Sequence, residues 1–460
     1  MRGARALSFV SILAILTVIA AAWPAGAATL QVGSGKTYAA PCEAAAAAAD
    51  GDVIEIDAGL YSGDVCSWYA SSLTIRGIGG YAHLDAAGEN AEGKAIWVIK
   101  GDNVIIESIE FSGATVPDQN GAGIRAEGSG LTLRHCWFHD NEEGILGGAG
   151  EVLIEYCEFG HNGYGDGQSH NMYLGNNVTS FTLRFSYTHH AIIGHNVKSR
   201  AQVNYILYNL IIDEEDGTAS YEIDLPNGGT SIIIGNVIQQ GPATDNSTML
   251  AFAEEGATNP SQDLYVVNNT FVNDRATGTF VRNSASTPAI VVNNIFVGDG
   301  TVLEGPGDTT SNLPTGDAGF VDRAGYDYHL AAGSPAIDAG IDPGSGGGMS
   351  LTPVFEYVHP ASGTERSIVD GVIDMGAFEF GNAPPADDGA PELADDVTEI
   401  PDIPDAADDA ATDLPDDGPR PDTAVDPGTD GPPPDAGPDA DAGGEEEGGG
   451  GEGCSCTMAA

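Results

Sequence analysis

Basic and imidazole side chains gather in one short stretch of a sequence that is otherwise strongly acidic. The chain has 16 Lys+Arg against 68 Asp+Glu, and seven of its ten histidines lie between residues 135 and 195. In "HHAIIGHNVKSRAQ" (189–202), Lys198 and Arg200 closely follow three histidines. Cations and imidazoles are the groups that neutralise a carboxylate and transfer protons. This stretch is therefore the first candidate for a site.

A repeated pattern in the middle of the chain predicts the elements that would position these residues. Seven segments share an alternating apolar triplet, a small polar residue and a further apolar residue. The small polar residues are Cys136, Cys157, Ser186, Asn209, Asn236, Asn269 and Asn294. Short β-rich pieces that recur with a period in the twenties indicate a solenoid, and long amphipathic helical patterns are missing from this region. We therefore predict an all-β, right-handed parallel β-helix whose small polar residues stack from coil to coil.

The two ends of the chain predict an exported protein with an unstructured tail. Residues 1–27 have the layout of a signal peptide, with two arginines, a short apolar run and a small-residue cleavage site. Residues 382–453 form an acidic Pro/Ala/Asp/Gly-rich linker that cannot bury enough apolar surface to fold, so we expect disorder there. No other stretch is apolar enough to cross a membrane. We place the β-helix domain at 28–381 and expect a monomer.

The formal net charge of −52 limits the partners of the protein. Nucleic-acid binding needs a basic surface, so the charge argues against it. An acidic polysaccharide would gain no long-range attraction and would need local cations or a bridging metal. A polysaccharide thus remains a candidate partner only where cations gather.

The six cysteines are consistent with export, since thiols can oxidise outside the cell. Cys136 and Cys157 occupy adjacent positions of the repeat, within reach of a disulfide, although neighbouring buried thiols can also stay reduced. Cys454 and Cys456 stand in a segment, 454–460, that resembles the start of the C-terminal sorting signals of myxobacteria and their relatives. That resemblance implies a secreted protein, or one at the outer surface of a Gram-negative bacterium.

Ionisable residues recur four positions after the repeated one, at the same turn of successive coils. They are Asp140, His161, His190 and Asp213. Their side chains suit a zinc-like ion, but a linear column cannot provide tetrahedral ligands unless the 163–171 loop brings in His170. The alternative is a row of turn residues along a sugar-binding groove. We predict no cofactor, with zinc here or calcium at the acidic turn 213–216 as the metals to consider.

The strand that contains Lys198 should present alternate side chains on an outer face. Five apolar residues align as its inward positions: Ile124, Ile145, Leu174, Val197 and Ile223. Their neighbours would then face outward around a groove whose far lip carries the histidines. These outward residues are Tyr173, Asn196, Lys198, Arg200, Glu222 and Asp224.

Two ends of this region resemble a known class of proteins. "TLQVGSGKTYAAPCEAAAAAADGDVIEIDAGLY", followed by "LTIRGIGG", is similar to the opening of bacterial pectate-lyase-like β-helix proteins. "YHLAAGSPAIDAG" (328–340) and "VIDMGAFEF" (372–380) resemble the closing segment of many secreted β-helix proteins. The resemblance implies a short capping helix at about 42–49, which would protect the strand edges of the first coil.

A second resemblance concerns activity. "NVKS" is similar to the strand that carries the lysine base of alginate lyases and chondroitinase B-like enzymes. It implies a polysaccharide lyase that works by β-elimination, with Lys198 as the base and Arg200 bound to the uronate carboxylate. The leaving oxygen would take its proton from His195, His170 or Tyr173. The sugar would also contact His161, His190, Asn196, Glu222 and Asp224.

The sequence departs from those lyases in two places. Asp224 stands where a catalytic arginine is expected, and residues 191–194 lack the acidic metal ligands. The alternative is that Lys198–Asp224 and Arg200–Glu222 are ion pairs on a solvated sheet, where such pairs contribute little. An ion-pair column of this kind is expected from Arg134, Glu155 and Arg184. The protein would then be a non-catalytic cell-surface module that binds carbohydrate or a partner.

Overall fold

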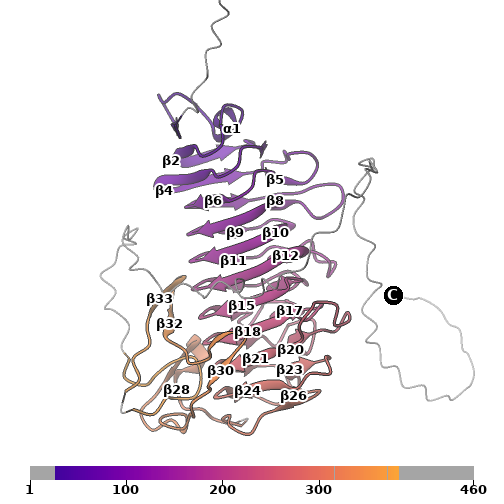
Figure 1. Ribbon diagram of the computed structural model, residues 1–460, viewed down its shortest axis with the longest axis vertical. Coiled ribbons are helices and arrows are strands. Elements are labelled where there is room, and N and C mark those ends of the chain that lie inside the picture. The colour runs from indigo at the N-terminus through magenta and orange to yellow at the C-terminus, as the bar shows by residue number, and fades with distance from the viewer. Residues whose placement is uncertain (1–25, 315, 370, 383–460) are drawn as a thin grey trace, which may run out of the picture. The chain divides into compact units, whose positions relative to one another are not determined.

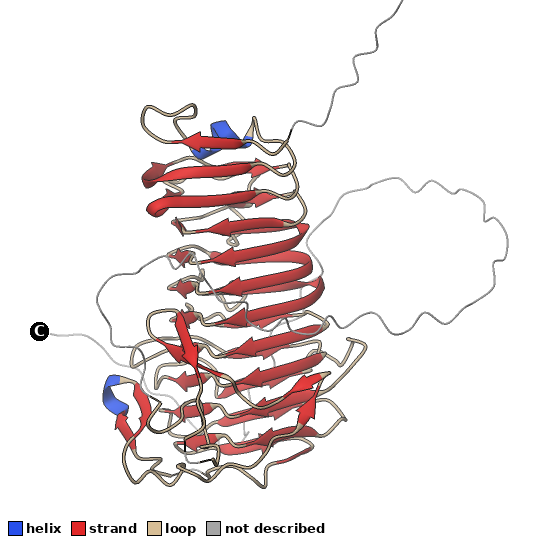
Figure 2. Cartoon of the chain, turned by 60° about the vertical axis from the view of Figure 1, so that its left-hand side comes forward, coloured by secondary structure: helices blue, strands red, loops and turns tan. Residues whose placement is uncertain are grey.

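Successive coils of the chain stack their strands into long parallel faces, as Figures 1 and 2 show. The computed structural model describes residues 26–314, 316–369 and 371–382. The predicted all-β parallel solenoid is confirmed. The predicted signal peptide, apart from residues 26 and 27, lies outside the described residues, as do the linker and the cysteine-containing segment beyond Asn382.

The coils have three faces. Face A contains β3 (Cys66–Trp68), β5 (Ala95–Ile99), the first halves of β8 (Ala122–Arg134), β10 (Glu143–Glu155) and β12 (Met172–Arg184), and β14 (Val197–Ser199), β17 (Ile223–Leu225), β20 (Thr248–Phe252), β23 (Thr279–Asn283) and β26 (Thr301–Glu304).

Face B contains β1 (Thr29–Val32), the first halves of β2 (Val53–Ser62) and β4 (Thr74–Asp85), β6 (Val104–Glu107), the second halves of β8, β10 and β12, and β15 (Val203–Leu207), β18 (Thr230–Ile234), β21 (Leu264–Val267), β24 (Ala289–Val292) and β27 (Gly307–Asp308).

Face C contains the second halves of β2 and β4, and β7 (Ile109–Ser112), β9 (Trp137–His139), β11 (Glu158–Gly160), β13 (Tyr187–His189), β16 (Leu210–Ile212), β19 (Val237–Gln240), β22 (Thr270–Asn273) and β25 (Ile295–Val297).

The inward side chains of all three faces form one continuous apolar core, as period-two alternation requires. On face C, Phe111, Phe138 and Phe159 stack with ring centroids 4.9 and 4.7 Å apart. Stacking of identical side chains follows from parallel pairing in register, which places equivalent residues of adjacent coils directly above one another.

The predicted stack of small polar residues is confirmed at the turn between faces B and C. The backbone N–H of each of the seven repeat residues, Cys136 through Asn294, donates to the side chain of the next repeat residue. Asn312 accepts from Asn294 and ends this ladder. Cys136 and Cys157 are buried free thiols, so the disulfide considered for them does not form. A side chain that binds the next coil satisfies backbone groups which a buried turn would otherwise leave unpaired.

Replacement of Asn236 by alanine is expected to lower the free energy of unfolding by about 2–4 kcal/mol. The Asn236 amide accepts from the backbone and side chain of Asn209 and donates to the carbonyl of Ile206 and to Asn269. The substitution leaves these buried groups unpaired. Chemical denaturation measures the loss, and the exposed Asn177→Ala is the control with an expected change below about 0.5 kcal/mol. A loss as small as the control's would contradict the role of the ladder.

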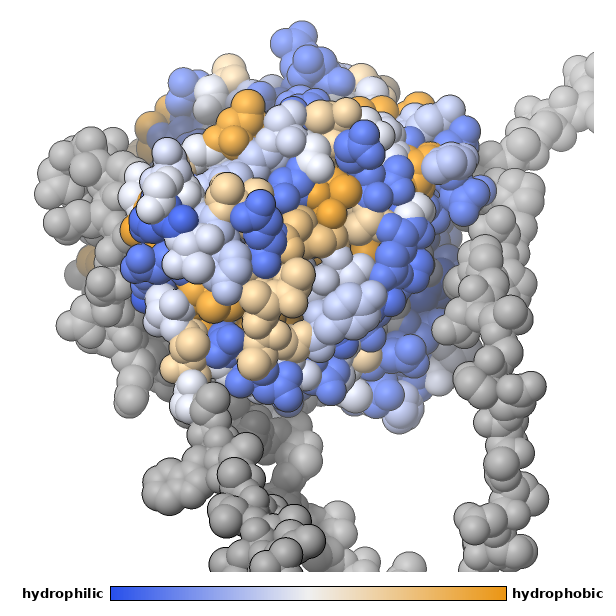
Figure 3. All heavy atoms as spheres, turned by 90° about the horizontal axis from the view of Figure 1, so that it is seen from above, coloured by the Kyte–Doolittle hydropathy of each residue, from blue (hydrophilic) through white to orange (hydrophobic). Residues whose placement is uncertain are grey.

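A short cap covers the N-terminal end. Helix α1 (Pro41–Ala45) begins at a proline and is shorter than the predicted 42–49, because the chain turns at Ala47 and Ala48, whose N–H groups both donate to Ala44. A Cys42–Cys66 disulfide joins α1 to β3. In the view from above in Figure 3, hydrophilic residues surround smaller apolar patches. Among the described helices, none has the length and apolar character needed to span a membrane.

The closing segment of the domain packs on faces B and C. It contains β28 (Phe320–Asp322), the 3-10 turn η1 (Arg323–Gly325), β29 (Asp327–Leu330), β30 (Ser345–Gly346), β31 (Met349–Ser350), β32 (Phe355–Val358) and β33 (Ser362–Glu365), with antiparallel pairs β28–β29, β30–β31 and β32–β33. At the edge of face B, Phe355 contacts the rings of Phe185 and Tyr208, which directly follow β12 and β15. On face C, Tyr328 and Phe378 join a buried cluster with outward residues of the coils. The closing segment thus buries apolar outer side chains of the coils that it contacts on faces B and C. Charged outward side chains lie on face A, at Lys198 and Asp224, and also on face B, at Arg134, Glu155 and Arg184.

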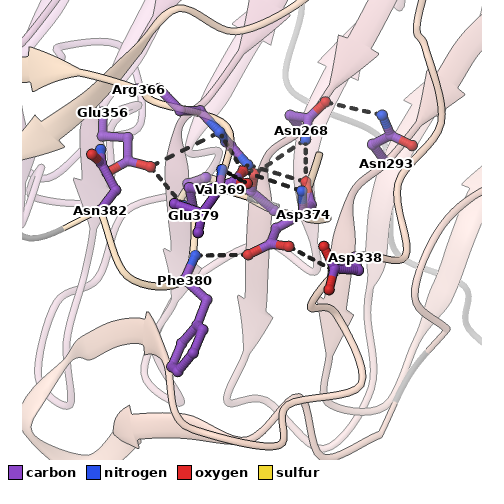
Figure 4. Close-up of polar contacts among 12 residues, drawn as sticks. Asn268, Asn293, Asp338, Glu356, Arg366, Val369, Asp374, Glu379, Phe380 and Asn382 are labelled. Atoms are coloured by element: carbon purple, nitrogen blue, oxygen red, sulfur yellow. Dashed lines mark hydrogen bonds and ion pairs between the residues drawn. The ribbon is translucent and has the colours of Figure 1, made fainter. Parts of the chain in front are cut away.

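A buried ionic network fastens this segment (Figure 4). The guanidinium of Arg366 is fully buried, donates to Glu379 Oε2 at 3.0 and 3.2 Å, and lies 3.9 Å from Glu356. The amide of Asn268, which belongs to a coil, donates to the carbonyl of Asp374 at 2.8 Å. The "VIDMGAFEF" motif is therefore one of the parts that connect the closing segment to the solenoid.

Candidate functional site

Lys198 lies in an outward column of face A that differs in one member from the predicted one. The predicted alignment of Leu174 with Val197 would place Gly175 beside Lys198. In the structure Tyr173 pairs with Lys198, which pairs with Asp224 on the next coil. Met172 takes the inward place predicted for Leu174. The 163–171 loop shifts the strand by two residues, and a two-residue shift preserves alternation, so the apolar pattern could not reveal it.

The Lys198 ammonium sits between an aromatic ring and a carboxylate. Its Nζ lies 5.1 Å from the centre of the Tyr173 ring and 3.8 Å from Asp224 Oδ2. The ring face and the carboxylate both attract a cation. The side chains of Lys198 and Asp224 retain 13% and 6% of their exposure, so both groups are largely removed from solvent.

Arg200 forms a second paired cation beside Tyr173. Its Nε donates to Tyr173 Oη at 2.7 Å, and its Nη groups donate to Asn227 and Glu255 at 2.6 Å each. The ion pair predicted between Arg200 and Glu222 is wrong, and Glu255 takes the role of Glu222. The pairing of cations is nonetheless confirmed for Lys198–Asp224 and for the Arg134–Glu155–Arg184 column. The Lys198–Asp224 pair is largely buried, however, and not on a solvated surface as expected.

His195 and His170 lie beneath this face instead of lining it. Their rings stack with centroids 4.4 Å apart, and both residues are at least 96% buried. His170 Nδ1 accepts the N–H of His195, and His195 Nδ1 accepts the N–H of Tyr221. Each neutral ring therefore carries its proton on Nε2, and that of His195 points to Asp224 Oδ2 at 3.5 Å. Burial lowers the pKa of both histidines well below the usual value, and the nearby cations lower it further.

The predicted outward placement of Asn196 and Glu222 is wrong, because both side chains are fully buried. They belong to a second internal ladder at the turn before face A. Asn171 donates to Asn196, which donates to Glu222 Oε2 at 2.6 Å and to Asp213 Oδ1 at 3.0 Å. Burial, and then the charge of Asp213, raises the pKa of Glu222 well above its usual value. These positions precede the strand, where strict alternation no longer applies.

Asp224 is the residue of this face whose acidity is most useful for chemistry near neutral pH. Burial raises the pKa of its carboxyl from 3.8 to about 7, while Lys198 opposes the rise. The carboxylate is thus poised to gain or lose a proton near neutral pH, as a general acid or base requires. Sequence reasoning had instead treated Asp224 as the residue that argues against a lyase.

Three further residues complete the face, and the strand pattern did not identify them. Glu255 and Asn227 hold Arg200 from loops that follow β20 and β17. Tyr221 donates from Oη to Glu254 at 3.0 Å. The available signal was local: "EE" at 254–255 is an acidic pair directly after a strand of face A, where it can meet the cations.

The histidine column lies at the turn between faces C and A. His161 and His190 are neighbours as predicted, with ring centroids 4.9 Å apart. Asp213 is fully buried and accepts from Asn196 and from backbone N–H groups, and His170 lies in the buried stack. The set of residues considered for a zinc-like ion is therefore not brought together. Within the described residues, two other groups have ligand atoms within 4.8 Å: His161 with His189 and His190, and His83 with Glu110 and His139.

Comparisons with known proteins identify the fold. The family model described as "Right handed beta helix region" matches residues 59–209, and no curated protein matches the sequence. A solved pectate lyase, Pel9A, superimposes with a TM-score of 0.56 at 15% identity, over 77% of this chain and 97% of the other. An Aspergillus niger pectin methylesterase (TM-score 0.31, 13% identity, 52% of this chain and 91% of the other) and the PL6 family alginate lyase AlyGC (TM-score 0.30, 15% identity, 75% and 60%) are more distant. The chain thus has the right-handed parallel β-helix fold of pectate-lyase-like proteins.

Proposed function

We propose that this protein is exported, binds an acidic polysaccharide on face A and cleaves it by β-elimination. The observation that carries the proposal is the column Tyr173–Lys198–Asp224, in which a cation, an aromatic hydroxyl and a carboxyl with a pKa of about 7 meet on face A. A solved protein of the same fold is a pectate lyase, which is consistent with a carbohydrate substrate.

Each group has a chemical role in the proposed reaction. Lys198 and Arg200 neutralise the carboxylate of a uronic acid, which makes the proton on the adjacent carbon easier to remove. Asp224 accepts that proton, a carbon–carbon double bond forms, and the bond to the leaving oxygen breaks. Tyr173 Oη accepts a hydrogen bond from Arg200, so its own proton is available for the leaving oxygen. His195 positions Asp224 and does not touch the sugar.

This assignment differs from the one implied by resemblance, in which Lys198 is the base. A carboxylate 3.8 Å away favours the charged ammonium, whereas Asp224 is already close to its protonation midpoint at neutral pH. His170 and His195 are both buried beneath the face, which removes them from the candidates for proton donor. The leaving-group role therefore falls to Tyr173.

Paired cations favour a second candidate, a non-catalytic carbohydrate-binding module. Lys198 faces Asp224, Arg200 faces Glu255, and Arg282 faces Glu254 and Glu304. A cation with a fixed protein partner gains less from a substrate carboxylate, because the first pair has to be broken. On this alternative, face A recognises sugar hydroxyls and leaves the polymer intact.

The test is the absorbance of unsaturated uronides released from alginate, pectate and glycosaminoglycans, combined with binding to the same polymers. We expect cleavage of one polymer class and a loss of at least 100-fold in Lys198→Met. Lys36→Met is the matched control, since Lys36 pairs with Asp57 at 2.8 Å near the capped end. Binding without cleavage would favour the module, and activity that survives Lys198→Met would place the site elsewhere.

A further inference from the structure

Three imidazoles converge at the turn between faces C and A, in the three-histidine cluster of His161, His189 and His190. Each offers a ring nitrogen within 4.8 Å of the others. His189 is the last residue of β13 and is buried, His190 is half-buried, and His161 is exposed. The cluster lies on a different part of the coil from Lys198, and the proposed elimination does not use it.

The backbone makes room for this arrangement at one specific glycine. Gly160 pairs with His189 on the adjacent coil, and a Cβ at Gly160 would lie 2.3–2.4 Å from the His189 ring. On its other side, the ring stacks on Tyr187 with centroids 4.2 Å apart. The His189 ring is therefore packed between Gly160 and Tyr187. His161 directly follows Gly160 and so lies next to this ring.

The hydrogen bonds of His189 and His190 define which nitrogens are free. His189 Nε2 lies 3.4 Å from Glu158, and His190 Nε2 lies 3.3 Å from Asp216. A carboxylate accepts, so these Nε2 atoms carry protons. In neutral rings the two Nδ1 atoms then both hold lone pairs, and they face each other at 2.8 Å. Two lone pairs at that distance repel unless a positive species lies between them.

We propose that His161, His189 and His190 bind one divalent transition-metal ion, with zinc as the best match. Neutral imidazole nitrogens are preferred ligands of zinc at about 2.0–2.1 Å, and three protein ligands leave a position open for water or a ligand oxygen. Tetrahedral zinc separates two such nitrogens by roughly 3.3 Å. A small rotation of the rings is therefore enough to admit the ion.

The surroundings match this assignment. Metal-binding histidines characteristically donate their other N–H to a carboxylate, as His189 and His190 do here with Glu158 and Asp216. These acids also make the turn attractive to a cation. The cluster of His83, Glu110 and His139 differs. Both ring nitrogens of His139 already face carboxylates, Asp140 at 2.7 Å and Glu110 at 3.1 Å. We therefore assign the ion to the three-histidine cluster alone.

The test is direct binding of Zn²⁺ and of Co²⁺, whose absorption reports coordination number, to the full chain. All proteins carry C454S and C456S, because two nearby cysteines can bind zinc on their own. We expect one Zn²⁺ per chain with a Kd of about 1 μM or below and intense Co²⁺ bands in the visible range. His161→Ala and His190→Ala should each weaken binding at least 100-fold. His161 is exposed, so its replacement should leave the fold intact.

His139→Ala is the matched control and should bind zinc as the parent does. Gly160→Ala should weaken binding as well, because it displaces the His189 ring. The proposal is overturned if the parent binds no Zn²⁺, which would leave a shared proton between His189 and His190. It is equally overturned if binding survives His161→Ala and His190→Ala, or if it is lost in His139→Ala. None of these outcomes depends on polysaccharide cleavage.

Discussion

Asp224→Asn is expected to lower the rate of polymer cleavage by about 10²- to 10⁴-fold, the usual contribution of a positioned general base. Asparagine keeps the shape of the side chain and its contacts with His195 and Lys198, but it cannot accept the substrate proton. Initial rates of double-bond formation measure the effect. Asp57→Asn, which removes the partner of Lys36 far from face A, is the control and should retain full activity.

The same residue predicts how activity and stability depend on pH. The base must be ionised, so activity should rise with pH through about 7, the pKa of Asp224. The contribution of Asp224 to folding stability changes with pH in the opposite direction. An acid whose pKa is higher in the folded protein favours folding when protonated, so its contribution is lost as pH rises from about 3.8 to 7. The rise in pKa corresponds to about 4 kcal/mol, and Asp224→Asn should therefore be more stable than the parent above pH 7.

Because activity and stability are expected to change in opposite directions, the Asp224→Asn variant distinguishes a loss of catalysis from a loss of folding. An inactive Asp224→Asn protein that unfolds at higher denaturant concentration than the parent at pH 8 would support the assignment. Activity within about threefold of the parent, or a pH profile with no inflection near 7, would show that Asp224 does not transfer the proton.

Arg366→Leu is expected to lower the free energy of unfolding by about 3–5 kcal/mol, the second of the two largest effects. The guanidinium is fully buried between Glu379 and Glu356 and also donates to the carbonyls of Gly376 and Asp374 (Figure 4). Leucine leaves two carboxylates buried without their cation. Burial already raises the pKa of Glu356, an effect that Arg366 opposes, so its loss should raise that pKa further.

Arg323→Leu is the matched control from the same closing segment. Arg323 pairs with Asp274 at 2.6 Å, but its side chain is 46% exposed, and exposed pairs contribute at most about 1 kcal/mol. Chemical denaturation of both variants measures the difference. Equal losses in the two proteins would contradict the view that the buried network fastens the closing segment to the coils.

Much of the solenoid could be predicted because its repeats are chemically explicit. The ladder from Cys136 to Asn294 follows from one small polar residue per coil, and Arg134, Glu155 and Arg184 align from alternation alone. Each of these features depends only on counting within regular strands. The right-handed β-helix therefore required no information beyond the pattern and the resemblance of its two ends.

The site was harder to predict because loops and turns there interrupt the regular alternation of side chains along the strands. The loop before Met172 changes the register by two residues, which alternation cannot detect, so Leu174 was aligned with Val197 and the direct pairing of Tyr173 with Lys198 was missed. Asn196 and Glu222 lie in turns, where the position of a side chain depends on hydrogen bonds to neighbouring coils. His189 was not recognised as part of the histidine cluster, because its orientation depends on Gly160 one coil away.

The most direct test of the central proposal is a crystal structure of the protein with an oligosaccharide of the polymer that it binds best. The proposed function predicts sugar density on face A, with a uronate carboxylate at Lys198 and Arg200 and a ring next to Tyr173. Asp224 should then lie within about 3 Å of the proton that leaves, as a general base must. Sugar bound on another face, with Lys198 still paired to Asp224, would contradict the proposed site.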